Sequence, residues 1–90
     1  MQADCEYGKH LYVLQMGELV KVGRSNFPTL RLSEHRNGNF WGSISLVATF
    51  EDAGFIEPWV LKALSSHETR SEWIHCSVQE ALEAIGQCLV

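Results

Sequence analysis

The sequence has no long hydrophobic run, few cysteines and no excess of positive charge, and each absence excludes a class of protein. No apolar stretch approaches the roughly 18 residues of a membrane-spanning helix, so we expect no contact with a membrane. The three cysteines, Cys5, Cys76 and Cys88, lack paired spacing, which argues against a disulfide scaffold. Residues 1–10 are polar and acidic, unlike a signal or transit peptide, so we expect a cytoplasmic protein.

Cysteine and histidine side chains leave one alternative open, which is a zinc site. Cysteine thiolate and neutral histidine are the ligands that structural zinc prefers. The candidates are His67, His75, Cys76 and Cys88. There is no C-x-x-C pair, and the spacings match no standard zinc finger. Zinc is therefore the less favoured interpretation of these four residues.

Charge is unevenly distributed along the 90 residues. The formal net charge is −4, which does not by itself indicate binding to nucleic acid. From Glu51 onward the acids far outnumber the bases, whereas most bases precede Phe50. These early bases are Lys9, Lys21, Arg24, Arg31 and Arg36. A phosphate-binding surface, if present, is therefore expected in the first half of the chain.

The residues from Leu11 to Arg24 have the pattern of a β-hairpin. Short apolar runs predict strands over about 10–15 and 19–24, and Gly17 between them tolerates the positive φ of a tight turn. Alternation places Lys21 and Gly23 on one face of the second strand. A lysine between two valines is either an edge residue that prevents aggregation or a functional group.

The remaining sequence alternates between helical and strand patterns. A capping box, formed by Ser77 and Glu80, precedes the last helix. The patterns predict, in order, a helix over 28–37, a central strand over 44–50, a helix over 52–65, a short strand over 72–76 and a helix over 78–89.

Without the short strand, the element order is β-β-α-β-α-α. This order predicts an α+β fold, in which helices flank a small, mainly antiparallel sheet of three strands. No repeat or linker divides the sequence. We therefore expect a single domain over residues 9–90, preceded by a flexible arm over residues 1–8.

Five polar side chains together carry the groups needed to hydrolyse a phosphodiester bond. A carboxylate can hold Mg²⁺ through several waters. A guanidinium binds non-bridging phosphate oxygens, and a phenol, amine or imidazole can activate water. The five residues are Tyr12, Lys21, Arg31, His35 and Glu57. The four-residue spacing of Arg31 and His35 places both on one helix face.

The segments that contain these residues resemble the GIY-YIG nuclease superfamily. His10-Leu11-Tyr12 and Lys21-Val22-Gly23 are similar to its paired hairpin motifs. The second motif resembles the Lys-Ile-Gly form of a small phage and bacterial branch. Arg31-x-x-x-His35 resembles the first-helix signature, and Ala53-x-x-x-Glu57 resembles the metal-binding helix. Glu72-Trp73-Ile74 is similar to a Glu-Trp-aromatic segment near the end of small members.

The resemblance implies an endonuclease that uses one Mg²⁺ or Mn²⁺ ion to cut DNA. By position, Tyr12 would activate or position water with help from Lys21 and His35. Arg31 would hold the scissile phosphate, and Glu57 would be the only protein ligand of the metal. Three departures from the family pattern stand out. His10-Leu11 replaces Gly-Ile, Lys21 replaces a tyrosine, and the late asparagine of many members has no clear match. Pro58, directly after Glu57, could also bend the metal-binding helix.

DNA is the expected partner, with Arg24, Arg36 and Trp41 as further contacts to nucleic acid. The sequence contains no separate domain for DNA recognition, so a protein partner or a homodimer would supply specificity. The alternative is a catalytically inactive module of the same fold, which binds nucleic acid or a protein. In a third interpretation, the polar residues are scattered over the surface of an ordinary domain.

Overall fold

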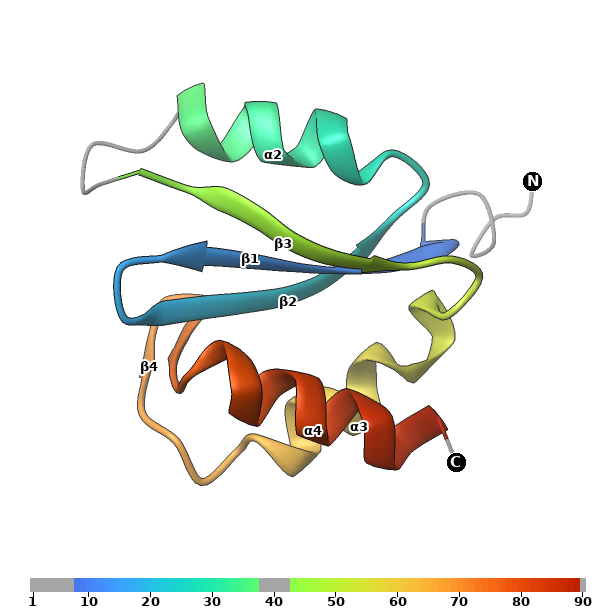
Figure 1. The fold of residues 1–90 in the computed structure, drawn as a ribbon, viewed down its shortest axis with the longest axis vertical. Coiled ribbons are helices and arrows are strands. Elements are labelled where there is room, and N and C mark those ends of the chain that lie inside the picture. Colours follow the sequence, from blue (N-terminus) through green and yellow to red (C-terminus); the bar gives the residue numbers. More distant parts are fainter. Residues whose placement is uncertain (1–7, 38–42, 90) are drawn as a thin grey trace.

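In a computed structural model, which describes residues 8–37 and 43–89, an antiparallel sheet lies between two layers of helix (Figure 1). The described strands have the order β3-β1-β2-β5-β4 across the sheet. Their bounds are β1 His10–Met16, β2 Leu19–Ser25, β3 Ser45–Phe50, β4 Thr69–Arg70 and β5 Trp73–His75. The helices are α2 Pro28–Asn37, the 3₁₀ turn η1 Gly54–Ile56, α3 Glu57–Ala63 and α4 Val78–Leu89.

The hairpin of β1 and β2 is confirmed. Gly17 has a φ of +61° in the turn, which a residue with a Cβ rarely adopts. The register pairs Tyr12 with Gly23 and Leu14 with Lys21, so all four residues share one face of the sheet. Lys21 lies beyond the part of β2 that pairs with β5, but it is only 7% exposed. The interpretation of Lys21 as a solvent-exposed edge lysine is therefore wrong.

The α+β class is confirmed, but the prediction of a three-stranded sheet is wrong. The short strand β5 pairs with the start of β2, and β4 pairs with β5. β4 has only the two residues Thr69 and Arg70. A strand this short cannot show the alternation of apolar and polar residues by which strands are predicted. β3 lies at the edge of the sheet rather than in its centre, and every second residue along it is exposed.

The predicted helices over 28–37 and 78–89 are confirmed as α2 and α4. The capping box is also confirmed. The Glu80 amide donates to Ser77 Oγ at 3.0 Å, and the Ser77 amide donates to Glu80 Oε1 at 2.8 Å. None of the helices in the described part of the chain is long and apolar enough to cross a membrane.

The helix predicted over 52–65 is shorter than expected. Asp52 has a φ of +60° and ends the turn after β3. The 3₁₀ turn η1 follows, and α3 begins only at Glu57. Pro58 consequently occupies the first turn of α3, where its missing N–H removes no helical hydrogen bond. Pro58 is therefore compatible with α3 without a bend in the helix.

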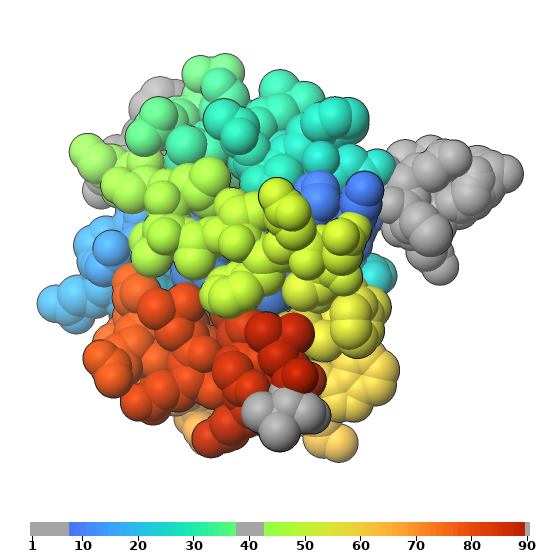
Figure 2. Space-filling model, turned by 45° about the vertical axis from the view of Figure 1, so that its right-hand side comes forward, coloured from blue at the N-terminus to red at the C-terminus, as the bar shows by residue number. Residues whose placement is uncertain are grey.

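Alternation along β1 and β2 divides the core between the two faces of the sheet. Figure 2 shows the resulting layers, with α2 on one side of the strands and α3 and α4 on the other. The face toward α3 and α4 carries Leu11, Val13, Val20 and Val22, packed with Ile56, Val60, Leu64, Ala81 and Ile85. The face toward α2 carries Tyr12, Leu14, Met16, Leu19, Ile44 and Trp73. Lys21 and Gly23 belong to this second face.

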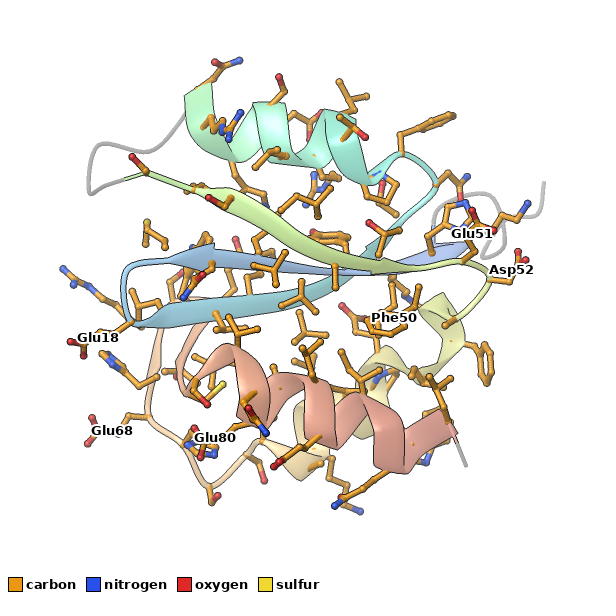
Figure 3. All side chains as sticks on the ribbon, viewed as in Figure 1. Glu18, Phe50, Glu51, Asp52, Glu68 and Glu80 are labelled. Carbon is orange, nitrogen blue, oxygen red and sulfur yellow. The ribbon has the colours of Figure 1, made fainter. Side chains whose placement is uncertain are left out.

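Acidic side chains gather at the two ends of the sheet. Figure 3 shows Glu18, Glu68 and Glu80 at the end with the β1–β2 turn, and Glu51 and Asp52 at the turn after β3. These carboxylates repel a polyanion at both ends.

Candidate functional site

The candidate site lies along the second half of β2. β5 pairs with β2 only at Leu19 and Val20, so among the described strands none borders β2 on that side beyond Val20. A pocket of about 420 Å³ opens there, and its lining includes Lys21, Glu57 and Glu72. It therefore brings a base from the sheet together with one carboxylate from α3 and one from the turn before β5.

Tyr12 lies across β2 because the residue opposite it is a glycine. A Cβ on Gly23 would stand 2.5 Å from the Tyr12 phenol oxygen. The phenol lies near Arg31 of α2, and its interaction with the guanidinium is the largest cause that raises the pKa of Arg31. Arg31 also donates to Glu34 Oε1 at 2.9 Å. The first hairpin motif and the first-helix signature are therefore in contact, although they are 19 residues apart in sequence.

Substituting Gly23 with alanine tests this packing. We expect the free energy of unfolding to fall by about 2 kcal/mol, because the new methyl group must push the phenol out of its position. Gly86→Ala in α4 is the control. A Cβ there meets nothing within 4 Å, so this variant should gain about 0.5–1 kcal/mol from helix propensity. Urea denaturation measures both changes. Wild-type stability in Gly23→Ala would mean that the phenol does not cross β2 at Gly23.

His35 lies one helical turn after Arg31 and packs edge-on against Trp73, with ring centroids 5.9 Å apart at 78°. Within the described residues its Nε2 atom is buried and has no hydrogen-bond partner. Burial lowers the pKa of His35, and the positive charges of Lys21 and Arg31 lower it further, against a smaller opposing effect of two carboxylates. His35 is therefore a neutral imidazole at pH 7, with one nitrogen not engaged in the fold.

Lys21 is held by Glu72, which sequence analysis did not include among the site residues. Lys21 Nζ lies 2.8 Å from Glu72 Oε1, with side-chain exposures of 9% and 57%. This hydrogen bond is the main cause that lowers the pKa of Glu72. A buried ammonium requires a carboxylate partner. A lysine between two strand valines was therefore a usable signal that an acidic residue, such as Glu72, had to lie nearby.

Glu57 reaches the pocket from the other layer of the protein. It is the first residue of α3, its side chain is 23% exposed, and its Oε1 lies 3.4 Å from Arg24 Nε. The structure thus groups Tyr12, Arg31 and His35 on the α2 side of the sheet, and it places Glu57 with Lys21 in the pocket at the open edge of β2.

The predicted contacts to nucleic acid are distributed over several places. Arg24 is on β2 and pairs with Glu57. Arg36 donates from Nε to the Ile44 carbonyl at 3.0 Å, so it joins α2 to the segment before β3. Trp41 lies outside the described residues. Of the two that the structure describes, Arg24 is the one that contacts a residue of the pocket.

Within residues 8–37 and 43–89, no group of three or more histidine, cysteine or acidic side chains could hold a metal ion. The four residues considered for zinc are all in this part of the chain. Burial raises the pKa of the Cys76 thiol, which opposes the thiolate form that zinc requires. These four residues therefore do not fit a structural zinc site.

Glu57 does fit an ion of another kind. Mg²⁺ usually keeps several waters and takes only one or two carboxylates from the protein. Glu57 offers one such carboxylate, partly exposed, at a pocket large enough for water. The donor set therefore suits a hydrated divalent cation that shares its remaining positions with an anionic ligand.

Comparison with known proteins gives one family match. The model of the T5orf172 domain matches residues 9–89. This family is associated with nuclease-related phage proteins. No curated protein and no solved structure matches the chain significantly. The match covers every element described above, from β1 to the end of α4.

Proposed function

We propose that this chain, which belongs to the T5orf172 domain family, is a GIY-YIG-type endonuclease that cuts DNA with one divalent metal ion. The observation that carries the proposal is the arrangement of polar side chains around the second half of β2. The Tyr12 phenol lies near the Arg31 guanidinium on the α2 side of the sheet, and Lys21, which is paired with Glu72, shares a pocket with Glu57 of α3. The nuclease-related associations of the family support the same assignment.

Arg31 is the proposed phosphate-binding residue. Its side chain is 44% exposed, and a guanidinium binds two non-bridging phosphate oxygens at once. Tyr12 is only 1% exposed, so water reaches the phenol oxygen only when the side chains over it move. A phosphate bound by Arg31 would lie close to the Tyr12 phenol.

Two groups can take the proton of the attacking water. Tyr12 is one, because its phenol oxygen lies over Gly23 of β2, on the same side of the sheet as Arg31. His35 is the other, because it is neutral at pH 7 and its Nε2 has no partner in the described structure. In either case the water oxygen forms the new bond to phosphorus as the bond to the leaving oxygen breaks.

Glu57 is the proposed metal ligand, with Mg²⁺ or Mn²⁺ as the ion. When bound, the ion would polarise the phosphate and stabilise charge on the leaving oxygen. The partly exposed Glu57 carboxylate anchors it, and the pocket leaves room for waters and phosphate oxygens.

DNA is the proposed substrate, and the distribution of charge limits how it binds. Carboxylates lie at both ends of the sheet, and the net charge of the chain is −4. Binding should therefore be weak and sensitive to salt. We assign sequence or structure specificity to a protein partner or to a second copy of the chain.

The test is cleavage of supercoiled plasmid and of branched DNA by the purified protein. We expect nicking or cutting with Mg²⁺ or Mn²⁺, and none with EDTA, because the proposed reaction requires the ion. Circular dichroism shows whether the protein stays folded in EDTA. A folded protein that cuts neither substrate with either metal would contradict the proposed activity.

Exposed aromatic residues favour a second candidate, a catalytically inactive module that binds a protein. Phe55 and Trp59 are 64% and 62% exposed, and they line an apolar pocket of about 190 Å³ together with Ile56 and Cys88. Exposed apolar patches often mark interaction sites. Stable binding of a partner by a variant that has lost Glu57, together with the absence of cleavage by the wild type, would favour this module.

A further inference from the structure

Arg24 already binds the carboxylate that the proposed function assigns to the metal. Its Nε lies 3.4 Å from Glu57 Oε1. Glu57 is the more buried partner, at 23% exposure against 41% for Arg24. A hydrated cation that binds this carboxylate must therefore share it with the guanidinium or displace the guanidinium.

A guanidinium and a divalent cation cannot both occupy this carboxylate at low cost. Both neutralise the same negative charge, and they repel each other at contact distance. We propose that Arg24 and the metal ion compete for Glu57, so that metal binding releases the Arg24 guanidinium to the DNA backbone. This inference rests on the proposed function, and it assigns Arg24 as a positioning residue that links metal binding to DNA binding.

The side chain of Arg24 packs against the backbone at Gly8. A Cβ on Gly8 would stand 2.6 Å from Arg24 Cδ, so the methylene groups lie against that glycine. The Gly54 amide donates to the Lys9 carbonyl at 2.9 Å, and the Lys9 amide donates to Asn26 Oδ1 at 2.9 Å. The segment at Gly8 and Lys9 is thereby held in place, and it supports the stem of Arg24 while the guanidinium exchanges partners.

Because metal and Arg24 exchange at Glu57, the binding of metal and the binding of DNA are cooperative. Without the metal, the positive charge of Arg24 is paired with the Glu57 carboxylate. With the metal bound, the same charge is available for a phosphate. Because coupling is reciprocal, the metal should strengthen DNA binding by the same factor by which DNA strengthens metal binding.

The direct test is Mn²⁺ affinity in the absence of DNA, from the loss of the free-ion signal in electron paramagnetic resonance. Arg24→Met keeps the stem and removes the charge, and we expect it to bind Mn²⁺ about fivefold more tightly than the wild type. Arg24→Gln should show the same direction. Lys9→Met is the matched control, because Lys9 forms an exposed pair with Asp52 at 3.7 Å. It removes the same unit of charge and should change the affinity less than about twofold.

The outcomes separate this inference from the proposed function. Tighter Mn²⁺ binding in both Arg24 variants, lost in Glu57→Gln, supports the competition. Unchanged or weaker binding in both Arg24 variants, with binding still dependent on Glu57, overturns the competition and leaves the metal site intact. Mn²⁺ binding that does not depend on Glu57 in any variant overturns the metal site and the competition together.

DNA affinity gives a second measurement that does not need catalysis. Ca²⁺ replaces the catalytic ion, and a short fluorescent branched DNA is titrated with and without it. We expect Ca²⁺ to tighten binding by the wild type and by Lys9→Met, and to have less than half of that effect on Arg24→Met. An equal effect of Ca²⁺ on all three proteins would contradict the release of Arg24.

Discussion

Glu57→Gln is expected to lower the rate of Mg²⁺-dependent DNA cleavage by about 10³-fold or more. The amide has nearly the shape of the carboxylate but no charge to hold a divalent cation. Loss of the ion removes several kcal/mol of transition-state stabilisation. The fold should survive, because the Glu57 side chain is partly exposed and its ion pair with Arg24 is on the surface. Single-turnover cleavage of a labelled substrate measures the change.

Glu51→Gln is the matched control for this substitution. Glu51 is an exposed acid in the turn after β3, at one end of the sheet (Figure 3). The variant carries the same change of net charge and should cleave within about twofold of the wild-type rate. Equal cleavage rates in Glu57→Gln and the wild type would place the metal elsewhere and remove the case for this pocket as the active site.

Elements with strong local signals were predictable from the sequence. The β1–β2 hairpin has alternating strand formers around Gly17, whose positive φ allows the tight turn. α4 has a capping box at its start and an apolar stripe along one face. In both cases the residues that direct the backbone are close in sequence, so no tertiary information was needed.

Elements that depend on distant partners were not predictable. β4 exists because its two residues pair with β5, which itself pairs with β2. The edge position of β3 follows from its antiparallel pairing with β1, although its apolar sequence is typical of a central strand. The apolar stripe over 52–65 did not show that Asp52 adopts a positive φ and delays α3 to Glu57.

The candidate site shows the same division. The spacing of Arg31 and His35 was enough to place both on one helix face. The contact between Arg31 and Tyr12 depends on the packing of α2 against the sheet over Gly23. The sequence resemblance included Glu72, but its pairing with Lys21 depends on the pairing of β5 with β2, which brings its carboxylate to Lys21. Local sequence therefore identified most of the polar groups, and tertiary pairing determined which of them meet.

Arg31→Lys is expected to lower cleavage by about 10²-fold although the positive charge remains. A lysine ammonium is a point charge and cannot form the two parallel hydrogen bonds of a guanidinium. Loss of one group that stabilises transition-state charge typically costs a factor of this size. Arg31→Met, which also removes the charge, should lower cleavage further and weaken DNA binding. The rate constant and the half-saturating DNA concentration are measured separately for both variants.

The difference between the two Arg31 variants tests whether Arg31 only attracts DNA or binds the scissile phosphate in the transition state. If Arg31 only attracts DNA, Arg31→Lys should keep the rate constant and Arg31→Met should change only the half-saturating concentration. If Arg31 holds the scissile phosphate in the transition state, both variants should lose rate. Lys62→Gln, on the exposed surface of α3, removes one positive charge and should leave the rate unchanged. If Arg31→Lys keeps the wild-type rate constant, Arg31 only attracts DNA by its charge. The scissile phosphate would then have to bind elsewhere than beside Tyr12.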